Sequence, residues 1–299
     1  MNLDDIKYRI KGISQTRRIT GAMETVSVAK MRKAMQKYNN NYTYHTRLRQ
    51  TIGDIVRHSR GIEHKYFTKS KSGRAAFIVI AGDKGLAGAF NNNVFNLAKS
   101  EIQKYNDPYI IAVGQTTREF FERTYKAEQT AKNGVRTDKI YYEYVHAAYN
   151  PSVTEAAAIT ESVIRLFSQD SADEVYAVFT AMEKGSSPKA QTVKLLPLDG
   201  GERGGGEAGK SGGYYKEVFY DPSPREVLDA LVPQYVTGLL YGCLVQSSAA
   251  EHTSRVQAMS QAARNAGEMI GKLNIVYHRA RQEKITNETL EINGNQYLR

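Results

Sequence analysis

Cysteine is nearly absent from this sequence, because Cys243 is the only one among 299 residues. One cysteine cannot form a disulfide within the chain, and the six histidines have no spacing typical of a structural zinc site. The sequence therefore predicts a protein of a reducing compartment that binds no metal of its own. Cys243 lies among apolar residues of an expected helix, which favours a packing role over a nucleophilic one.

Long hydrophobic runs are also missing. No stretch approaches the roughly 18 consecutive apolar residues of a membrane-spanning helix. Asn2 to Asp5 contain neither the apolar core of a signal sequence nor the acid-free bias of a transit peptide. Taken as a full-length product, the chain is expected to stay in the cytoplasm. Its hydrophobic share of 41% and charged share of 24% exclude a disordered chain.

Acidic residues are scarce near the N-terminus. Residues 1–60 hold 13 Lys/Arg and 4 Asp/Glu, residues 61–223 hold 20 of each, and residues 224–299 hold 8 and 7. Nearly all of the net charge of +10 therefore lies on the first segment. This asymmetry suggests a polyanionic partner, either a nucleic acid or an acidic protein surface.

Proline is absent from both ends, since all seven prolines lie between positions 108 and 233. Both ends can therefore form long helices. A first helix is predicted to about residue 58, with glycines at 12, 21 and 53 that cost about 1 kcal/mol each relative to alanine. Its apolar residues follow three- and four-residue steps at Ile6, Ile10, Ile13, Ile19, Met23, Val26, Leu48, Ile52 and Ile55.

The second long helix has a clear start signal. Ser223, Pro224 and Glu226 form a capping box with proline at the first helical position, and Pro233 is expected to kink or restart the helix. A heptad seam follows at Met259, Ala263, Ala266, Ile270, Leu273, Tyr277, Ala280 and Lys284. Each helix would be roughly 80 to 90 Å long, so the sequence predicts that they pair as a long antiparallel coiled coil.

The middle of the chain reads as an α/β domain. Strands are predicted at Ala75 to Ala81, Tyr109 to Val113 and Val175 to Ala181, alternating with helices near 91–105, 115–126 and 152–168. The expected organisation is a helix at 1–60, a central Rossmann-like α/β domain at 61–222 and a helix at 223–299. A flexible glycine-rich loop is expected at 200–213, followed by a strand at 214–220.

Two glycine-rich segments resemble nucleotide-binding loops. Gly204 to Ser211 satisfies the phosphate-loop pattern, but Gly212 follows where a helix must begin, so a chance hairpin loop is favoured. Gly82, Gly85 and Gly88 follow the first strand without dinucleotide-loop spacing, which favours a tight turn with close packing.

Catalytic sets are not recognisable in the sequence. Two groups of charged residues are interpreted first as solvated pairs within a helix, namely Glu251 with Arg255, and Glu283 with Arg279 and Arg281. The spacing of these charged residues does not by itself indicate a function.

Three separated segments resemble the gamma subunit of F-type ATP synthases, in the order found in that family. They are residues 6–32, which contain ITGAMETVSVAKMR, residues 82–91 (GDKGLAGAFN), and residues 251–286, which contain EHTSRVQAM and YHRARQ. The similarity spans the whole chain. Gly21 stands where the family usually has lysine, and Ala87 where cysteine is common.

The resemblance implies a central rotor shaft without a catalytic site or cofactor of its own. ATP, ADP and Mg would belong to a ring of three alpha and three beta subunits, with an epsilon subunit and a membrane c-ring as further partners. One copy would act at the cytoplasmic face of a bacterial membrane, without nucleic acid. The partner-contact residues implied by resemblance are Arg9, Met23, Lys30, Arg32, Glu251, Arg255, Arg281, Gln282 and Thr286.

Two other classes of function are weighed against the rotor. A nucleic-acid-binding coiled coil would explain the basic N-terminal segment, but the segment has no aromatic stacking platform. A nucleotide-dependent α/β enzyme would explain the middle domain, but no acid, base or phosphate loop has the required context.

Overall fold

The structure is a computed structural model, and it divides into two compact units. One unit comprises Met1–Ala29 with Arg255–Arg299, and the other comprises Lys30–Ser254. The residues that the structure describes are 3–58, 64–68, 73–106, 108–128, 139–182, 187–198 and 220–296. The glycine-rich loop 200–213 and most of the strand expected at 214–220 lie outside these residues.

A five-stranded sheet forms the centre of the unit Lys30–Ser254 and confirms the predicted α/β class. Its strands are β1 (Ala75–Ile80), β2 (Tyr109–Val113), β3 (Ile140–Tyr144), β4 (Glu174–Ala181) and β5 (Lys189–Leu196). They lie in the order β3-β2-β1-β4-β5, and only β5 pairs antiparallel with its neighbour. The sequence pattern anticipated β1, β2 and β4 but not the two edge strands.

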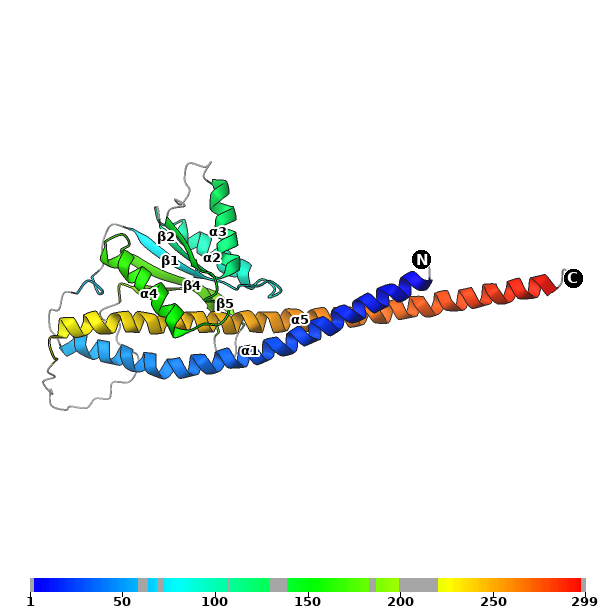
Figure 1. Cartoon of the computed structure of the whole chain (residues 1–299), viewed down its shortest axis with the longest axis horizontal. Helices are drawn as coiled ribbons and strands as arrows, with labels where there is room; N and C mark the ends of the chain where they lie inside the picture. The colour runs from blue at the N-terminus through cyan, green and yellow to red at the C-terminus, as the bar shows by residue number, and fades with distance from the viewer. Residues whose placement is uncertain are drawn as a thin grey trace. The chain divides into compact units, whose positions relative to one another are not determined.

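Helices cover both faces of this sheet (Figure 1). Helices α2 (Phe90–Ile102) and α3 (Gln115–Glu128) cover one face, where side chains of Phe77 and Val79 are buried. Helix α4 (Val153–Ser168) and the first part of α5 cover the other face, against Ile78 and Ile80. Since successive side chains of a strand point to opposite faces, the unbroken apolar run of β1 matches a strand buried on both sides.

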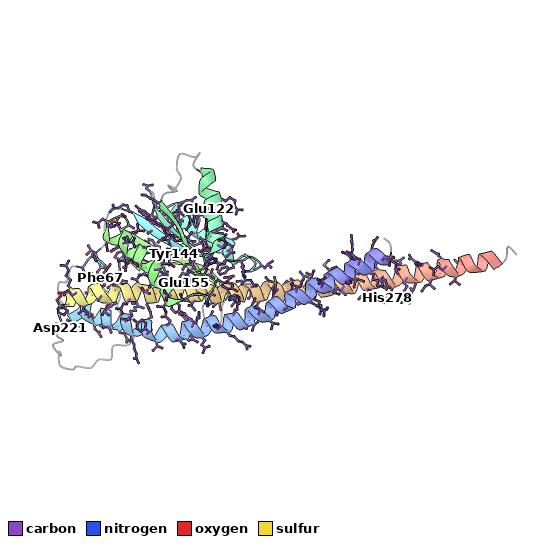
Figure 2. The ribbon with its side chains drawn as sticks, in the orientation of Figure 1. Phe67, Glu122, Tyr144, Glu155, Asp221 and His278 are labelled. Carbon is purple, nitrogen blue, oxygen red and sulfur yellow. The ribbon has the colours of Figure 1, made fainter. Side chains whose placement is uncertain are left out.

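Helix α4 is capped at its start and is tied to the sheet along its length. Ser152 caps it by accepting the Glu155 N–H at 3.2 Å, and Glu155 accepts the Ser152 N–H in return. Tyr144 is at the end of β3, and its label lies near that of Glu155 in Figure 2. Its hydroxyl lies 2.7 Å from the Ser162 hydroxyl of α4. These contacts fix the segment between β3 and α4 at both ends.

The two long helices are α1 (Leu3–His58) and α5 (Pro224–Gln296). The start signal of α5 is confirmed, since Ser223 Oγ accepts the Glu226 N–H at 3.3 Å and donates to its carboxylate at 2.9 Å. The helix runs continuously through Pro233. Helix α5 is long and apolar enough to span a membrane, but half of its most apolar 18-residue stretch is buried inside the protein.

Helices α1 and α5 pair antiparallel in each unit. In the unit Lys30–Ser254, the Asn41 amide donates to the Gly238 carbonyl at 2.9 Å and also lies beside Gly242. In the other unit, the Arg17 guanidinium lies against Gly267. Glycine thus occurs on α5 where a side chain of α1 approaches its backbone closely.

The predicted seam of α5 is confirmed in the unit formed by the chain ends. Met259 and Ala266 are buried. The seam residues between and after them are half-buried, up to Ala280, while Lys284 is exposed. Small and apolar residues at heptad spacing therefore make the contact with α1.

The predicted seam of α1 is wrong at two positions. Ile19 and Val26 are 54% and 55% exposed, while Thr20 and Ser27 beside them are buried. Thr20 Oγ1 donates to the Thr16 and Arg17 carbonyls at 3.1 and 3.0 Å, and Ser27 Oγ donates to the Met23 carbonyl at 2.7 Å. Because their hydroxyls are satisfied within the helix, these small residues can take seam positions that apolarity alone assigns to isoleucine and valine.

Candidate partner-contact residues and the strand-end junction

The loop after β1 is a tight turn, as its glycine spacing predicted. The Gly82 N–H donates to the Asn91 side chain at 2.9 Å, and the Gly82 carbonyl accepts the Thr116 N–H at 3.3 Å and its hydroxyl. Gly88 has a φ of 60°, a conformation that favours glycine. The loop is therefore hydrogen-bonded to the first turn of α3, which follows β2 directly.

Two of the resembling segments meet at this loop. A Cβ at position 82 would lie 2.8 Å from Cδ of Glu251, so the loop backbone and the α5 carboxylate are in close contact. Ala250 packs in one cluster with Ala87 and Phe90. The structure thus brings residues 82–91 and 251 onto one junction, which we call the strand-end junction.

The expectation that Glu251 and Arg255 form a solvated helix pair is wrong. Glu251 is 5% exposed and Arg255 is 7% exposed. Helix periodicity placed the two residues on one face but gave no sign that this face is covered. Burial of a charged side chain is costly, so these positions are held by specific interactions rather than by water.

Asp83 connects the loops after β1 and β2 at the junction. Its Oδ1 accepts the Gln115 N–H at 2.8 Å, while its Oδ2 is buried without a hydrogen-bond partner. Burial raises the pKa of the Asp83 carboxyl, and the N–H groups of Gln115 and Tyr149 and the charges of His146 and Lys84 oppose this shift. The sequence interpretation did not single out Asp83, although an acid directly after a buried strand is a usable signal.

Lys30, one of the predicted contact residues, interacts with Tyr149 within the chain. Its Nζ donates to the Tyr149 hydroxyl at 2.7 Å and lies 4.2 Å from the ring centroid. The Nζ of Lys84 lies 4.9 Å from the same centroid. Tyr149 was not anticipated either, since a tyrosine in a loop carries no periodic pattern.

The remaining predicted contact residues do not form one cluster in the structure. Arg9 and Met23 lie on α1 in the unit of the chain ends, the first exposed and the second half-buried, whereas Arg32 lies exposed on α1 in the other unit. Arg281, Gln282 and Thr286 are exposed on α5. The predicted set is therefore distributed along the two long helices.

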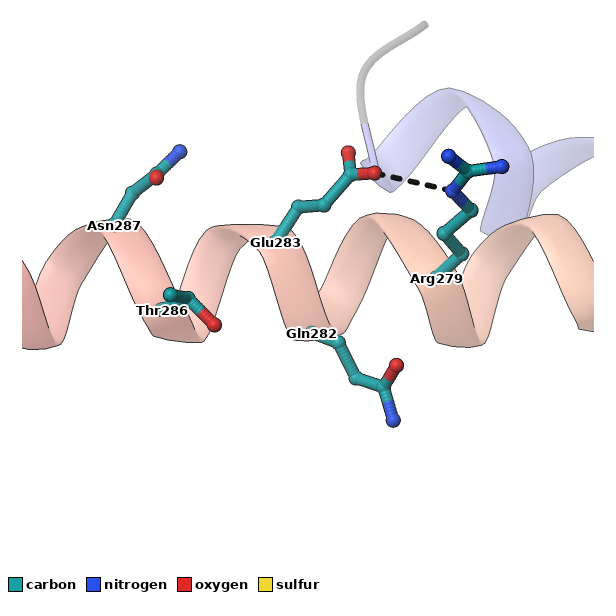
Figure 3. A pocket seen from close by; sticks show the side chains of 5 residues that line it. All are labelled: Arg279, Gln282, Glu283, Thr286 and Asn287. Atoms are coloured by element: carbon teal, nitrogen blue, oxygen red, sulfur yellow. Dashed lines mark hydrogen bonds and ion pairs between the residues drawn. The ribbon is translucent and has the colours of Figure 1, made fainter.

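An open, polar recess lies on α5 near the C-terminal predicted residues. Figure 3 shows its five side chains, with Arg279 and Glu283 reaching to one side of the helix and Gln282 to the other. The Arg279 Nε donates to Glu283 at 3.2 Å, and both side chains are well exposed, which confirms the solvated pair predicted there. The other lining residues are Thr286 and Asn287.

The described residues contain no group of three or more metal-ligating side chains. In open α/β sheets, ligands bind beyond the carboxyl ends of the strands, and here Asp83 and Glu251 occupy that position beside Gly82. The phosphate-loop pattern at 204–211 lies outside the described residues.

Known proteins similar to this chain share its full length. The family model described as ATP synthase matches residues 2–296. The ATP synthase gamma chain of Ruminiclostridium cellulolyticum is 36% identical over 297 residues, covering 98% of this chain and 97% of the relative. That of Alkaliphilus metalliredigens is 39% identical over 292 residues, covering 98% and 96%.

Solved structures agree in fold. A chain of the Euglena gracilis mitochondrial ATP synthase rotor is matched with a TM-score of 0.62 at 15% identity, covering 95% of this chain and 98% of that one. A chain of the Tetrahymena thermophila mitochondrial ATP synthase central stalk and c-ring is matched with a TM-score of 0.56 at 18% identity, covering 82% and 99%. With relatives above 30% identity over nearly every residue, the chain belongs to the ATP synthase gamma chain family.

Proposed function

We propose that this chain is the central rotor shaft of an F-type ATP synthase and couples proton flow through a membrane c-ring to ATP synthesis or hydrolysis in an alpha/beta ring. The chain is a gamma subunit, a non-catalytic stalk subunit of the ATPase complex. The observation that carries the proposal is the full-length match to gamma chains, which includes both long helices as well as the sheet domain.

The surface of the chain-end unit supports a shaft that works inside other subunits. Three large apolar side chains on α1 are exposed, namely Tyr8, Ile19 and Val26, at 80%, 54% and 55%. On α5, Ile275 is 72% exposed and Leu290 is 63% exposed. Apolar side chains at this density on paired helices favour a surface covered by partner proteins.

We further propose that the nine residues predicted from the resemblance contribute to the contact with the ring. Arg9, Arg32, Arg281, Gln282 and Thr286 are exposed and can touch a partner directly. Met23 and Lys30 are half-buried, and Glu251 and Arg255 are buried, so these four would act on the partner surface through neighbouring residues of the shaft.

The proposal extends to the assembly as a whole. Three alpha and three beta subunits, an epsilon subunit and a c-ring are the proposed partners, with one copy of this chain at the cytoplasmic face of the cell membrane. Nucleotide and Mg are proposed to bind to the ring alone. The chain is proposed to divide functionally into the shaft helices 1–60 and 223–299 and the base domain 61–222.

Imaging of the native complex tests the proposal. The chain would be tagged, purified from membranes in mild detergent and imaged with its partners. We expect it at the axis of a six-membered ring. Recovery without ring subunits would contradict the rotor, and a salt-sensitive load of nucleic acid would favour a nucleic-acid-binding coiled coil instead. Nucleotide bound by the purified chain alone would favour an α/β enzyme.

A further inference from the structure

The segment that follows β3 is attached to α1 by two lysines. Lys30 Nζ donates to the Tyr149 hydroxyl at 2.7 Å and lies over its ring. Lys37 Nζ donates to the Asn150 side chain at 3.1 Å and to the Pro151 carbonyl at 2.9 Å. Since residues seven apart lie on the same face of a helix, the two ammonium groups bind consecutive residues of one segment from one side of α1.

The loop after β1 is joined to the carboxyl edge of the sheet. Asp83 in this loop accepts the Gln115 N–H at 2.8 Å. Asp83 and Gln115 follow β1 and β2 directly. A side chain that contacts this loop is therefore held against the sheet.

Lys84 adds a second cation to the Tyr149 ring. Its Nζ lies 4.9 Å from the ring centroid, and it comes from the loop after β1, as Asp83 does. A cation over an aromatic face is attracted by the ring quadrupole, and Tyr149 is 44% exposed. The tyrosine ring thus contacts both a lysine of the shaft helix and a lysine of the sheet loop.

We propose that Lys30, Tyr149 and Lys84 form a brace that fixes α1 to the sheet and that the complex needs for efficient coupling. The inference rests on the proposed rotor function, because a brace matters only where torque passes between sheet domain and helix. It gives Lys30 a role inside the chain as a positioning residue, in place of a direct contact with the ring.

Two properties distinguish the brace from a direct partner contact. Arginine at position 30 keeps both the cation over the ring and a donor for the hydroxyl, so it preserves the brace. Loss of Tyr149 removes the interaction partner of Lys30 within the chain, so the effects of the two substitutions should not add. A lysine that binds the ring directly would keep its effect when Tyr149 is already absent.

The experiment uses the complete complex in sealed phospholipid vesicles. ATP hydrolysis and ATP-driven proton uptake are measured for Lys30→Met, Lys30→Arg, Tyr149→Ala and the double variant Lys30→Met with Tyr149→Ala. Lys33→Met is the matched control, since Lys33 is an exposed lysine on the same helix. Subunit composition is checked for each complex, and Tyr149→Phe replaces Tyr149→Ala if the latter does not assemble.

We expect proton uptake per ATP hydrolysed to fall about twofold in Lys30→Met, in Tyr149→Ala and, to the same extent, in the double variant. Lys30→Arg and Lys33→Met should resemble the wild type. With Tyr149→Phe, which keeps the ring, a smaller loss than in Lys30→Met is expected. An unchanged ratio of proton uptake to ATP hydrolysis in Lys30→Met, or additive losses in the double variant, would overturn the brace. Proton pumping by the wild-type complex would still support the rotor function.

Hydrogen exchange of the segment 145–152 in the same complexes gives an independent readout. Exchange should be faster in Lys30→Met than in Lys33→Met, because the segment loses its attachment to α1. Equal exchange in the two variants would show that Lys30 does not hold the segment, and it would also overturn the brace.

Discussion

The carboxylate of Glu251 on α5 lies directly over the α-carbon of Gly82 at the end of β1. Its Oε1 and Oε2 would each be 3.0 Å from a Cβ at that position, and Cδ would be 2.8 Å away. Any larger residue at 82 would therefore have to displace the buried Glu251 carboxylate. The two residues fix how closely α5 and the sheet can pack.

Gly82→Ala should destabilise the chain by about 1 to 3 kcal/mol, because the added methyl group displaces a buried carboxylate. Thermal unfolding of the purified chain measures the change. Gly85→Ala is the matched control, since no atom lies within 4 Å of a Cβ there. Equal melting of the two variants would show that Glu251 moves aside without cost.

The Cys243 thiol should be inert in the folded chain. It is fully enclosed, and burial raises its pKa to about 12, so the thiolate that reacts with alkylating agents is scarce at neutral pH. Iodoacetamide should label the chain rapidly only after unfolding, as followed by mass spectrometry. Activity of the assembled complex should also be indifferent to thiol reductants, because a lone cysteine forms no internal disulfide. A reductant activation traced to this subunit would contradict the interpretation.

His64 should make stability depend on pH. Its Nε2 lies 3.3 Å from Asp229 at the start of α5, and its Nδ1 accepts the Tyr66 N–H at 3.4 Å. Burial lowers the pKa of His64, so the folded state favours the neutral ring, and nearby Asp229 opposes this shift. Its contribution is complete above the unfolded pKa of about 6.5 and is lost as the pH falls below that value, because the unfolded state then binds more protons.

Urea unfolding between about pH 5 and pH 7.5 tests this sign. His64→Gln should flatten the loss of stability toward low pH, while His278→Gln, at an exposed position of α5, should not. A wild-type chain that becomes more stable on acidification through this range would refute the assignment.

Met23→Lys should impair coupling while hydrolysis survives. Met23 is half-buried on α1, and a lysine there could extend to a carboxylate of the surrounding ring. One charge-assisted contact of about 1 to 3 kcal/mol would favour some angular positions of the rotor over others. The measurement is ATP hydrolysis against proton uptake in vesicles, with Met23→Leu as an uncharged control of similar volume. Parallel loss of both activities would identify Met23 as an ordinary seam residue.

The long helices could be predicted because their signals are local. Proline-free ends, the Ser223 cap and the heptad spacing from Met259 to Ala280 each depend on neighbouring residues only. The edge strands β3 and β5 could not be found in this way, since β3 is only five residues long and contains a glutamate, and β5 mixes polar with apolar residues. Their strand form depends on pairing with β2 and β4.

The strand-end junction was only partly predictable for a similar reason. The resemblance pointed to residues 82–91 and to Glu251, but the contact between them joins residues far apart in sequence. Asp83 and Tyr149 gained their roles from contacts between loops that lie far apart in the sequence, which no periodicity encodes. The polar seam positions Thr20 and Ser27 were missed because hydropathy does not register a hydroxyl that is satisfied by its own helix.

The hydroxyls of Thr20 and Ser27 do not fix how α1 and α5 are aligned in the chain-end unit. Because they donate to carbonyls of α1 itself, these hydrogen bonds set neither the axial position nor the rotation of α5 beside it. The heptad repeat of the seam then sets the axial alignment of the two helices. Insertion of one whole heptad into each helix would reproduce the same surface one repeat further on. The length of the paired helices can therefore be changed in steps of seven residues.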